Sequence, residues 1–506
     1  MEFFVDKTIL VTGATGFLAK VLVEKILRTQ PDVKKIFLLI RAKDSASAKQ
    51  RFIHQVVESE LFSVVKEKYG GDLFAAILEE KVFPVAGDVS FEDLGIENKE
   101  VKDEMLREVD IIVNSAATTT FNERYDVAMN INTLGAMNVL NFAKNCFKVN
   151  IALVHVSTAY VCGEGNGIML EKPLILGETL NGTSKLDIDV EKKVIQEKLE
   201  ELQTQNANEK DVKSAMRDLG IQRAKLHGWP NTYSFTKAMG EMLLYGLKEN
   251  VCVIILRPTI ITSTYKQPFP GWIEGARTMD VFVLMYGKGK SSFMIGDPNT
   301  ILDTIPVDMV VNSMLASIIV HQHHHQQEHE HSEYWSSSCS PIYHVGSSSS
   351  SCSNNNGKPL RLLDVTNMLF RYFTETPWIS KSGDLVRVRQ YVLLPSMTSL
   401  RRYIALRYLP LLQVLKVMNM ILYHYFEERC RSVEKSINMV IRFAEIYKPY
   451  VFFYGIFDDT NTKGLRVEIR KRSGGDDDIL FFDPNCIDWE DYFINTHFPG
   501  VVKYAF

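Results

Sequence analysis

The stretch TILVTGATGFLA, residues 8–19, decides the fold of this chain. A β-branched apolar run ends there in a glycine turn, and a helical pattern over residues 17–30 begins directly after the turn. In such a turn one glycine permits the tight bend, a second lets the backbone approach a pyrophosphate, and the N-terminus of the helix faces the negative charge. Gly13 and Gly16 take these positions, and Ala19 stands where a third glycine often occurs. The stretch therefore predicts a dinucleotide-binding unit.

Further apolar runs, separated by helical patterns, continue outward from this turn. They cover residues 35–41, 81–88, 110–116, 150–158 and 251–258. Strands that are apolar along their whole length indicate a parallel sheet that is covered by helices on both faces. The predicted fold class is therefore α/β, with a doubly wound Rossmann-type parallel sheet.

The length of 506 residues is too great for one ordinary core, so two domains are expected. We place an NADPH-binding catalytic domain, which includes the substrate-binding part, at residues 1–320. A smaller, mainly helical and aromatic-rich domain follows at residues 358–506. Residues 321–357 carry His-rich and Ser/Asn-rich tracts that cannot bury enough apolar area to fold, around a short buried strand at 341–346.

The type of dinucleotide is indicated at the end of the second predicted strand. Arg41 ends this strand and Lys43 follows, whereas NAD enzymes usually carry an acidic residue there to hold the ribose hydroxyls. Because a guanidinium can pair with a 2′-phosphate, the predicted cofactor is NADPH. The alternative is that Arg41 is a solvated loop charge.

Other predicted cofactor contacts follow the strand ends. Small residues after the fourth strand, Ala116 and Ala117, would let the cofactor lie close, although helix–sheet packing explains them almost as well. The full set of predicted cofactor-binding residues is Thr12, Gly13, Thr15, Gly16, Phe17, Leu18, Arg41, Lys43, Asp88, Val89, Ala116, Tyr233 and Lys237.

The segment NTYSFTKAMGE, residues 231–241, contains the predicted acid–base pair. Tyr233 and Lys237 are four residues apart in a good helix former, so the phenol and the ammonium lie on one helical face. A tyrosine with a pKa near 10 is a poor acid–base group at neutral pH. We expect the nearby ammonium, together with an oxidised nicotinamide, to lower the pKa of Tyr233.

A hydroxyl residue at the end of the fifth predicted strand completes the predicted triad. Thr158 would donate to a carbonyl oxygen alongside Tyr233, which stabilises the oxyanion that grows during hydride transfer. Ser157 is the alternative for this role. Asn132, on the helix after the fourth strand, either helps to position the lysine through water or is a helix-surface residue.

Several long stretches are more specific than any of these short motifs. They include INTLGAMNVLNFAK, HVSTAYVCGE, RAKLHGWPNTYSFTKAMGE, PFPGWIEGARTMD and GIFDDTNTKGLR. These stretches resemble plant alcohol-forming fatty acyl-CoA reductases, which are related to the male-sterility proteins, and the resemblance implies an extended short-chain dehydrogenase domain followed by a C-terminal domain typical of these reductases. The resemblance implies reduction of long-chain or very-long-chain acyl-CoA by two NADPH, through an aldehyde, to a primary alcohol for wax or related surface lipids. It also implies residence at the cytosolic face of the endoplasmic reticulum, with the cytosol as the alternative.

The bulk composition limits the partners. A net charge of −4 gives no reason to expect nucleic acid, and the seven scattered cysteines fit a reduced compartment. The first strand begins too early for a signal peptide before it, and no run of about 18 uncharged apolar residues predicts a membrane span.

The basic and apolar run at 400–426 either lies in a membrane interface or packs as an amphipathic helix. A metal function is not expected for the His-rich tract, and the oligomeric state is open.

Two rival functions fit the same motifs. One is another enzyme of this fold, such as a sugar-nucleotide epimerase or a reductase that stops at the aldehyde. The other is a lipid- or nucleotide-binding protein that has lost catalysis, against which the intact Thr158, Tyr233 and Lys237 argue.

Overall fold

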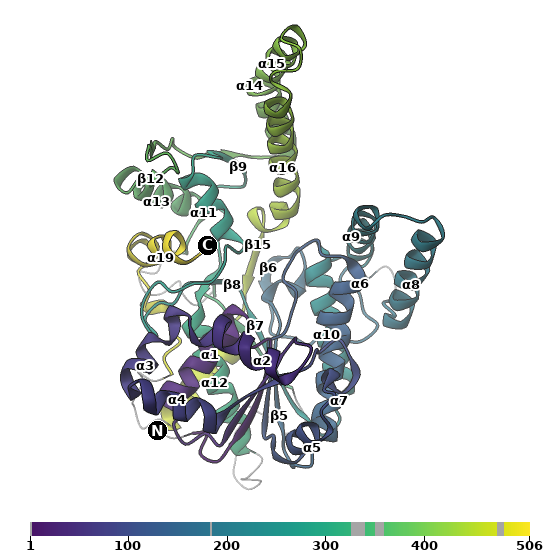
Figure 1. Ribbon diagram of the computed structural model, residues 1–506, viewed down its shortest axis with the longest axis vertical. Coiled ribbons are helices and arrows are strands. Elements are labelled where there is room, and N and C mark those ends of the chain that lie inside the picture. Colours follow the sequence, from purple (N-terminus) through teal and green to yellow (C-terminus); the bar gives the residue numbers. More distant parts are fainter. Residues whose placement is uncertain (1–2, 183–184, 325–339, 350–358, 473–479, 506) are drawn as a thin grey trace.

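A seven-stranded parallel sheet forms the centre of the protein (Figure 1). The computed structural model describes residues 3–182, 185–324, 340–349, 359–472 and 480–505. The strand order is β11-β7-β5-β4-β1-β2-β3. The strands are β1 (Thr8–Thr12), β2 (Lys35–Ile40), β3 (Val82–Ala86), β4 (Ile111–Asn114), β5 (Ala152–Val156), β7 (Cys252–Pro258) and β11 (Ile342–Val345).

The predicted doubly wound fold is confirmed. All six predicted strands of the nucleotide-binding part are present, and the short run predicted at 341–346 forms β11, which is buried and pairs with β7. The strand order reverses between β1 and β4, and in open sheets of this kind ligands bind outside the carboxyl ends of the strands at that point. The His-rich and Ser/Asn-rich tracts at 325–339 and 350–358 lie outside the described residues.

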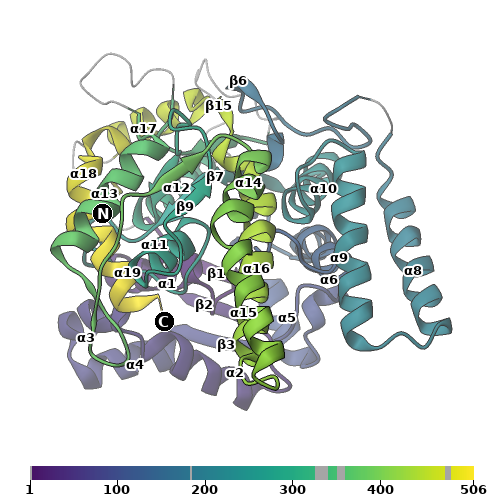
Figure 2. The same ribbon diagram turned by 90° about the horizontal axis from the view of Figure 1, so that it is seen from above.

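Helices cover both faces of the sheet (Figure 1). One face carries α1 (Phe17–Thr29) and α12 (Val307–His324), and the other carries α5 (Lys99–Glu108), α7 (Gly135–Asn145) and α10 (Thr232–Leu247). Smaller helices flank these layers: α2 (Ser45–Phe52), α3 (Ser63–Tyr69), α4 (Gly71–Lys81) and α6 (Tyr125–Ala128). The long pair α8 (Ile188–Thr204) and α9 (Glu209–Leu226) stands outside α10 (Figure 2).

The C-terminal part is mainly helical, as predicted. Its helices are α13 (Leu362–Glu375), α14 (Met397–Arg407), α15 (Leu409–Ile421), α16 (Glu427–Val451), α17 (Thr460–Arg472), α18 (Trp489–Asp491) and α19 (Phe498–Tyr504). Helices α14, α15 and α16 project from the rest of the protein, and we call residues 397–451 the helical arm (Figure 1).

Contacts across the predicted domain boundaries are extensive. Strand β15 (Tyr454–Phe457) pairs in parallel with β6 (Asn166–Met169), and β14 (Val392–Leu394) pairs with β9 (Phe293–Ile295). One hydrophobic core runs from β1 to α13 and α19. The boundaries at 320 and 358 stay a prediction, but the two parts share one core.

The helical arm exposes much of its apolar surface. Leu411, Ile421 and Tyr423 are 67%, 67% and 95% exposed, whereas Leu400, Ile404 and Leu412 are buried against the neighbouring helices. Packing therefore accounts for only part of the apolar face predicted at 400–426. Within the described ranges no single helix is long and apolar enough to cross a membrane, although α14 and α15 meet that test together with a 41° bend between them.

Candidate active site

The glycine turn after β1 leaves no room for side chains. Gly13 has a φ of 69°, and a Cβ atom built there would lie 2.8 Å from the Cα and N atoms of Ala116. The Gly16 amide donates to the Gly13 carbonyl oxygen at 2.8 Å and begins α1. Both glycines, with Thr15, Phe17 and Leu18 of the predicted set, line a cleft of about 790 Å³ at the carboxyl ends of the strands.

Thr12 lies beneath the cleft instead of lining it. Its hydroxyl accepts from the Ala116 amide at 3.1 Å and donates to the side-chain oxygen of Asn114 at 2.8 Å. The side chain is fully buried. Thr12 therefore fixes the glycine turn against the end of β4, and its predicted cofactor contact is indirect at most in this structure.

Two arginines reach the cleft near the end of β2. Arg41 lines the cleft with its side chain exposed, and Arg51 on α2, which the sequence analysis did not identify, lines it as well. A guanidinium N–H of Arg51 donates to the Arg41 carbonyl oxygen. Lys43 is exposed beside the cleft but is not among its lining residues, and Asp44 caps α2 by accepting from the Ser47 amide. The carboxylate of Asp44, which is closest in sequence to this strand end, is thus used as a helix cap.

The strand ends of β3 and β4 bring the remaining predicted cofactor residues to the same cleft. Asp88, Val89, Ala116 and Ala117 all line it. Asp88 accepts from the amide of Ser90 at 2.9 Å, and this bond orients its carboxylate. The geometry agrees with the predicted contacts, which stay predictions because no ligand defines them.

Tyr233 and Thr158 meet at the opposite end of the cleft. Tyr233 is near the start of α10 and Thr158 follows the end of β5, and both residues line this end of the cleft. The Thr158 hydroxyl also accepts from the Tyr160 amide at 3.3 Å. The structure therefore brings Tyr233 and Thr158, the two predicted hydroxyl donors, to one cleft.

The expected lowering of the pKa of Tyr233 is wrong for this structure. Burial raises the pKa of Tyr233 to about 12, and only the Thr158 hydrogen bond and the charge of Arg277 oppose that effect. The physical reason is that the ammonium of Lys237 points elsewhere. Its Nζ atom donates to the Val156 carbonyl oxygen at 2.6 Å and lies 3.3 Å from Nε2 of His155.

Lys237 is itself perturbed. Its side chain is 1% exposed, and desolvation lowers its pKa to about 8 against the opposing effect of the Glu241 carboxylate. His155 is equally buried, and desolvation together with the charge of Lys237 holds its pKa well below the usual value. The Nδ1 atom of His155 lies 3.1 Å from Nδ2 of Asn114. The sequence analysis did not identify His155, because a histidine within an apolar strand has no distinguishing pattern.

Ser157 keeps its predicted place as the alternative donor, whereas one of the two interpretations of Asn132 is wrong. The Ser157 hydroxyl is buried at the cleft and has no hydrogen-bond partner among the described residues, so Ser157 remains an alternative donor to Thr158. Asn132 is 1% exposed, so its interpretation as a helix-surface residue is wrong. Its amide exchanges hydrogen bonds with the Thr118 backbone at 3.0 and 3.1 Å and donates to Thr236 at 3.0 Å. It ties the loop after β4 to the helix that carries Lys237.

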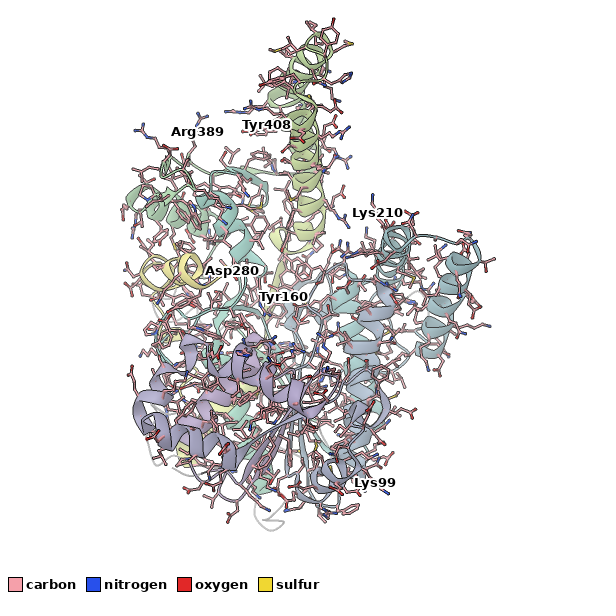
Figure 3. All side chains as sticks on the ribbon, in the orientation of Figure 1. Lys99, Tyr160, Lys210, Asp280, Arg389 and Tyr408 are labelled. Carbon is pink, nitrogen blue, oxygen red and sulfur yellow. The ribbon has the colours of Figure 1, made fainter. Side chains whose placement is uncertain are left out.

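The C-terminal part contributes one wall of the cleft. Phe443, Ile446, Tyr447 and Tyr450 of α16 line it. The ring of Tyr450 stacks on Phe121 at 4.8 Å, and its hydroxyl accepts from the side-chain amide of Asn231 at 2.7 Å. Figure 3 labels Tyr160, which lies at the base of the helical arm, where its ring contacts Tyr450 at 5.0 Å. Sequence patterns gave no signal for these contacts, because they join segments more than 200 residues apart.

The residues of the cleft fit a nicotinamide dinucleotide. At one end the backbone approaches closely at Gly13, where any Cβ would collide, and the N-terminus of α1 faces the space where a pyrophosphate would lie. At the other end lies the buried hydroxyl of Ser157, which has no hydrogen-bond partner in the described part of the chain, and Thr158 and Tyr233 line the same cleft. The arrangement suits hydride transfer at a carbonyl whose oxygen accepts from hydroxyl donors.

Two solved structures share the fold. The terminal R domain from the myxalamid PKS-NRPS pathway matches with a TM-score of 0.50 and 19% identity, covering 91% of this chain and 85% of its own. A thiolation-reductase di-domain from an archaeal non-ribosomal peptide synthetase matches with a TM-score of 0.51 and 15% identity, covering 96% of this chain and 74% of its own. At this level of identity the two comparisons support the fold alone.

Comparison with known sequences gives the family. Two family models, both described as male sterility protein, match residues 11–314 and 407–506, and the first of them is an NAD-binding model. The alcohol-forming fatty acyl-CoA reductase of Simmondsia chinensis is 47% identical over 505 residues, which cover 100% of this chain and 98% of that protein. Fatty acyl-CoA reductase 1 of Arabidopsis thaliana is 45% identical with the same coverage. With its dinucleotide turn and hydroxyl pair in one cleft, the chain belongs to the male sterility family of NAD(P)-binding fatty acyl-CoA reductases.

Proposed function

We propose that this protein reduces long-chain or very-long-chain acyl-CoA to a primary alcohol with NADPH, through an aldehyde, and supplies wax or related surface lipids. The observation that carries the proposal is that Tyr233 and Thr158 line one end of a cleft whose other end is the glycine turn. The alcohol-forming relative from Simmondsia chinensis supports the product.

The chain's own residues perform the polar part of each reduction. Bound NADPH supplies hydride to the carbonyl carbon. Tyr233 and Thr158 both face the carbonyl oxygen, so their hydroxyl groups stabilise the negative charge that develops there. In the first reduction the resulting hemithioacetal breaks its carbon–sulfur bond, and CoA leaves as a thiol with one proton. In the second reduction Tyr233 gives its proton to the aldehyde oxygen, and the alcohol forms.

Lys237 supports this mechanism from the position it holds in the structure. Its hydrogen bond to the Val156 carbonyl keeps the Nζ atom beside the strand that carries Thr158. From there the ammonium can reach a cofactor ribose hydroxyl and favour the anionic form of Tyr233 once its proton has been transferred. Neither reduction needs a metal ion in this scheme.

The preference for NADPH over NADH rests on Arg41 and Arg51. Both arginines line the cleft near the end of β2, where a 2′-phosphate of NADPH would lie, and Asp44 is occupied as a helix cap. We expect Arg51→Ala to raise the KM for NADPH while the KM for NADH changes little. Arg107→Ala, at an exposed position of α5 outside the cleft, is the matched control. Equal effects of Arg51→Ala on both cofactors would argue against this assignment.

The helical arm supports a peripheral membrane contact, and with it a location at the cytosolic face of the endoplasmic reticulum. Its exposed apolar residues include Leu411, Met420 and Ile421, and basic side chains such as Arg402 and Arg407 lie on the same arm. Flotation of the full-length protein with anionic vesicles tests the contact. We expect Leu411→Asp with Ile421→Asp to abolish flotation, whereas Val190→Asp on exposed α8 leaves it unchanged.

The direct test of the activity is product analysis of the purified full chain with palmitoyl-CoA and NADPH. We expect hexadecanol, CoA thiol and NADP in amounts that match two hydride transfers per alcohol. Accumulation of aldehyde without alcohol would favour the reductase that stops at the aldehyde. The absence of any NADPH oxidation would favour a binding protein that has lost catalysis.

A further inference from the structure

A second, smaller cavity adjoins the cleft on the side of the helical arm. It lies between α11 (Met279–Gly287), β9, α14 and α16. Phe443 and Tyr447 of α16 line both spaces, and α11 also runs from one to the other, since Val281 lines the cleft whereas Phe282 and Met285 line the cavity. Two helices therefore lead from the hydroxyl pair of Tyr233 and Thr158 into this cavity.

The cavity wall is almost wholly apolar. Its lining residues are Phe282, Met285, Ser291, Phe293, Met294, Ile295, Leu400, Val440, Phe443, Ala444, Tyr447 and Val451. Among these described residues none is charged, and the Ser291 hydroxyl is already used, because it donates to the Phe293 carbonyl oxygen at 2.9 Å. A polar ligand would find no buried charge to hold it, whereas an alkyl chain would lose no hydrogen bonds there.

Two aromatic rings separate the cavity from the cleft. Tyr447 packs edge-on against Phe282 at 4.8 Å and lies parallel to Phe443 at 6.0 Å. Both Phe282 and Tyr447 are partly exposed and so are free to turn more readily than the fully buried rings of the core. The aromatic side chains of Phe443 and Tyr447 thus belong to the wall that the cavity shares with the cleft.

The free volume of the cavity is about 30 Å³, which is room for about one water molecule. An alkyl chain can enter only by displacing side chains. Met285 and Met294 allow this, because methionine is unbranched and adapts its shape to irregular space. Leu400 of α14, which is fully buried, lines the cavity from the helical arm.

We propose that this cavity, between α11, β9, α14 and α16, binds the distal part of the acyl chain and sets the chain length that the enzyme accepts. The proposal rests on the proposed function, because it takes the substrate to be an acyl-CoA. The thioester lies by Tyr233 and Thr158, the chain passes Phe443 and Tyr447, and its methyl end lies toward Leu400. The C-terminal part thereby forms the wall that limits the length of the bound acyl chain.

Two substitutions of opposite effect test the proposal. Ala444→Leu fills the cavity, and Met294→Ala enlarges it, since both side chains line it without reaching the hydroxyl pair. Asn438→Leu places the same side chain at an exposed position of α16 outside the cavity and is the control. The measurement is the ratio of kcat/KM for stearoyl-CoA to that for lauroyl-CoA, because both substrates undergo the same chemistry.

We expect Ala444→Leu to lower this ratio about tenfold. One methylene group that no longer fits an apolar pocket changes substrate discrimination by roughly this factor or more. Met294→Ala should raise the ratio, and Asn438→Leu should leave it unchanged. Unchanged ratios in both cavity variants, with alcohol still formed from lauroyl-CoA, would overturn the proposal. If the unaltered protein formed no product from either substrate, the proposed function would fail instead. Should Ala444→Leu lose NADPH binding through misfolding, Met294→Ala decides the question by itself.

Discussion

The Nζ atom of Lys237 donates to the Val156 carbonyl oxygen at 2.6 Å, and Val156 ends the strand that leads to Thr158. In this position desolvation lowers the pKa of Lys237 to about 8, with Glu241 opposing the shift and His155 as its other neighbour. We expect kcat/KM to fall as the pH rises through about 8, because the free enzyme then loses the ammonium that the mechanism needs. A pH profile with saturating NADPH measures this fall. A flat profile up to pH 10, roughly the usual range for lysine, would contradict it.

The sign of the shift also makes a prediction for stability. A lysine with a lowered pKa in the folded state binds fewer protons there than in the unfolded chain between pH of about 8 and 10.5. The free energy of unfolding contributed by Lys237 therefore rises across that window, whereas below it the buried ammonium carries its full penalty. Lys237→Met should lose this rise, which denaturant unfolding at several pH values would detect. The same slope in both proteins would contradict the assignment.

His155 is expected to influence the titration of Lys237. The Thr12 hydroxyl donates to Oδ1 of Asn114, which turns Nδ2 of Asn114 toward Nδ1 of His155. Because Nδ2 of Asn114 is a donor, Nδ1 of His155 accepts, and the ring proton of His155 is on Nε2, which faces Lys237. An N–H group in that place favours the neutral amine form of Lys237. His155→Phe should move the alkaline fall of kcat/KM to higher pH, whereas His155→Gln, which keeps an N–H donor, should move it less. Equal profiles for the phenylalanine and glutamine variants would refute this interpretation.

Gly13→Ala should weaken dinucleotide binding and destabilise the protein. The new Cβ would lie 2.8 Å from the Ala116 backbone at a φ of 69°, and a strained backbone of this kind costs about 1–3 kcal/mol. Gly71→Ala at the start of α4 is the control, because a Cβ there meets nothing within 4 Å. Fluorescence titration with NADPH and thermal unfolding measure both effects. Wild-type affinity in Gly13→Ala would show that the turn does not hold the cofactor.

Tyr233→Phe should lower alcohol formation roughly 100- to 10,000-fold, because it removes the proton donor without changing the ring. Thr158→Val removes the second donor and should cost less, since the Ser157 hydroxyl lies beside it without a partner among the described residues. Dinucleotide titration is the control in both cases and should stay unchanged. A larger loss in Ser157→Ala than in Thr158→Val would assign the second donor to Ser157.

The sequence predicted those features that depend on residues close together in the chain. The strands were found because each is apolar on both faces, and Gly13 was found because its turn needs a positive φ. Tyr233 and Lys237 were found from their spacing on one helix. The directions of these side chains could not be predicted from their spacing. The ammonium of Lys237 lies beside His155, and both are buried only once the sheet has assembled.

The missed residues are those brought in by long-range packing. Arg51 reaches the cleft because α2 folds back beside the end of β2, and Tyr450 because α16 returns to the cleft from the far part of the chain. Neither position has a pattern of its own. The family resemblance supplied the activity, while the shape of the cavity next to Tyr447 required the structure.

The parallel pairing of β15 with β6 has a consequence for biosynthesis. During synthesis Asn166 leaves the ribosome long before Tyr454, its partner in the register. Strand β6 therefore cannot pair with β15 until most of the chain has been translated. During that interval the ring of Phe121 lacks its stacking partner Tyr450 and the cleft has an open side. Shortened products of premature stop codons before residue 450 would accordingly emerge with a nucleotide-binding half but without the wall that shelters its chemistry.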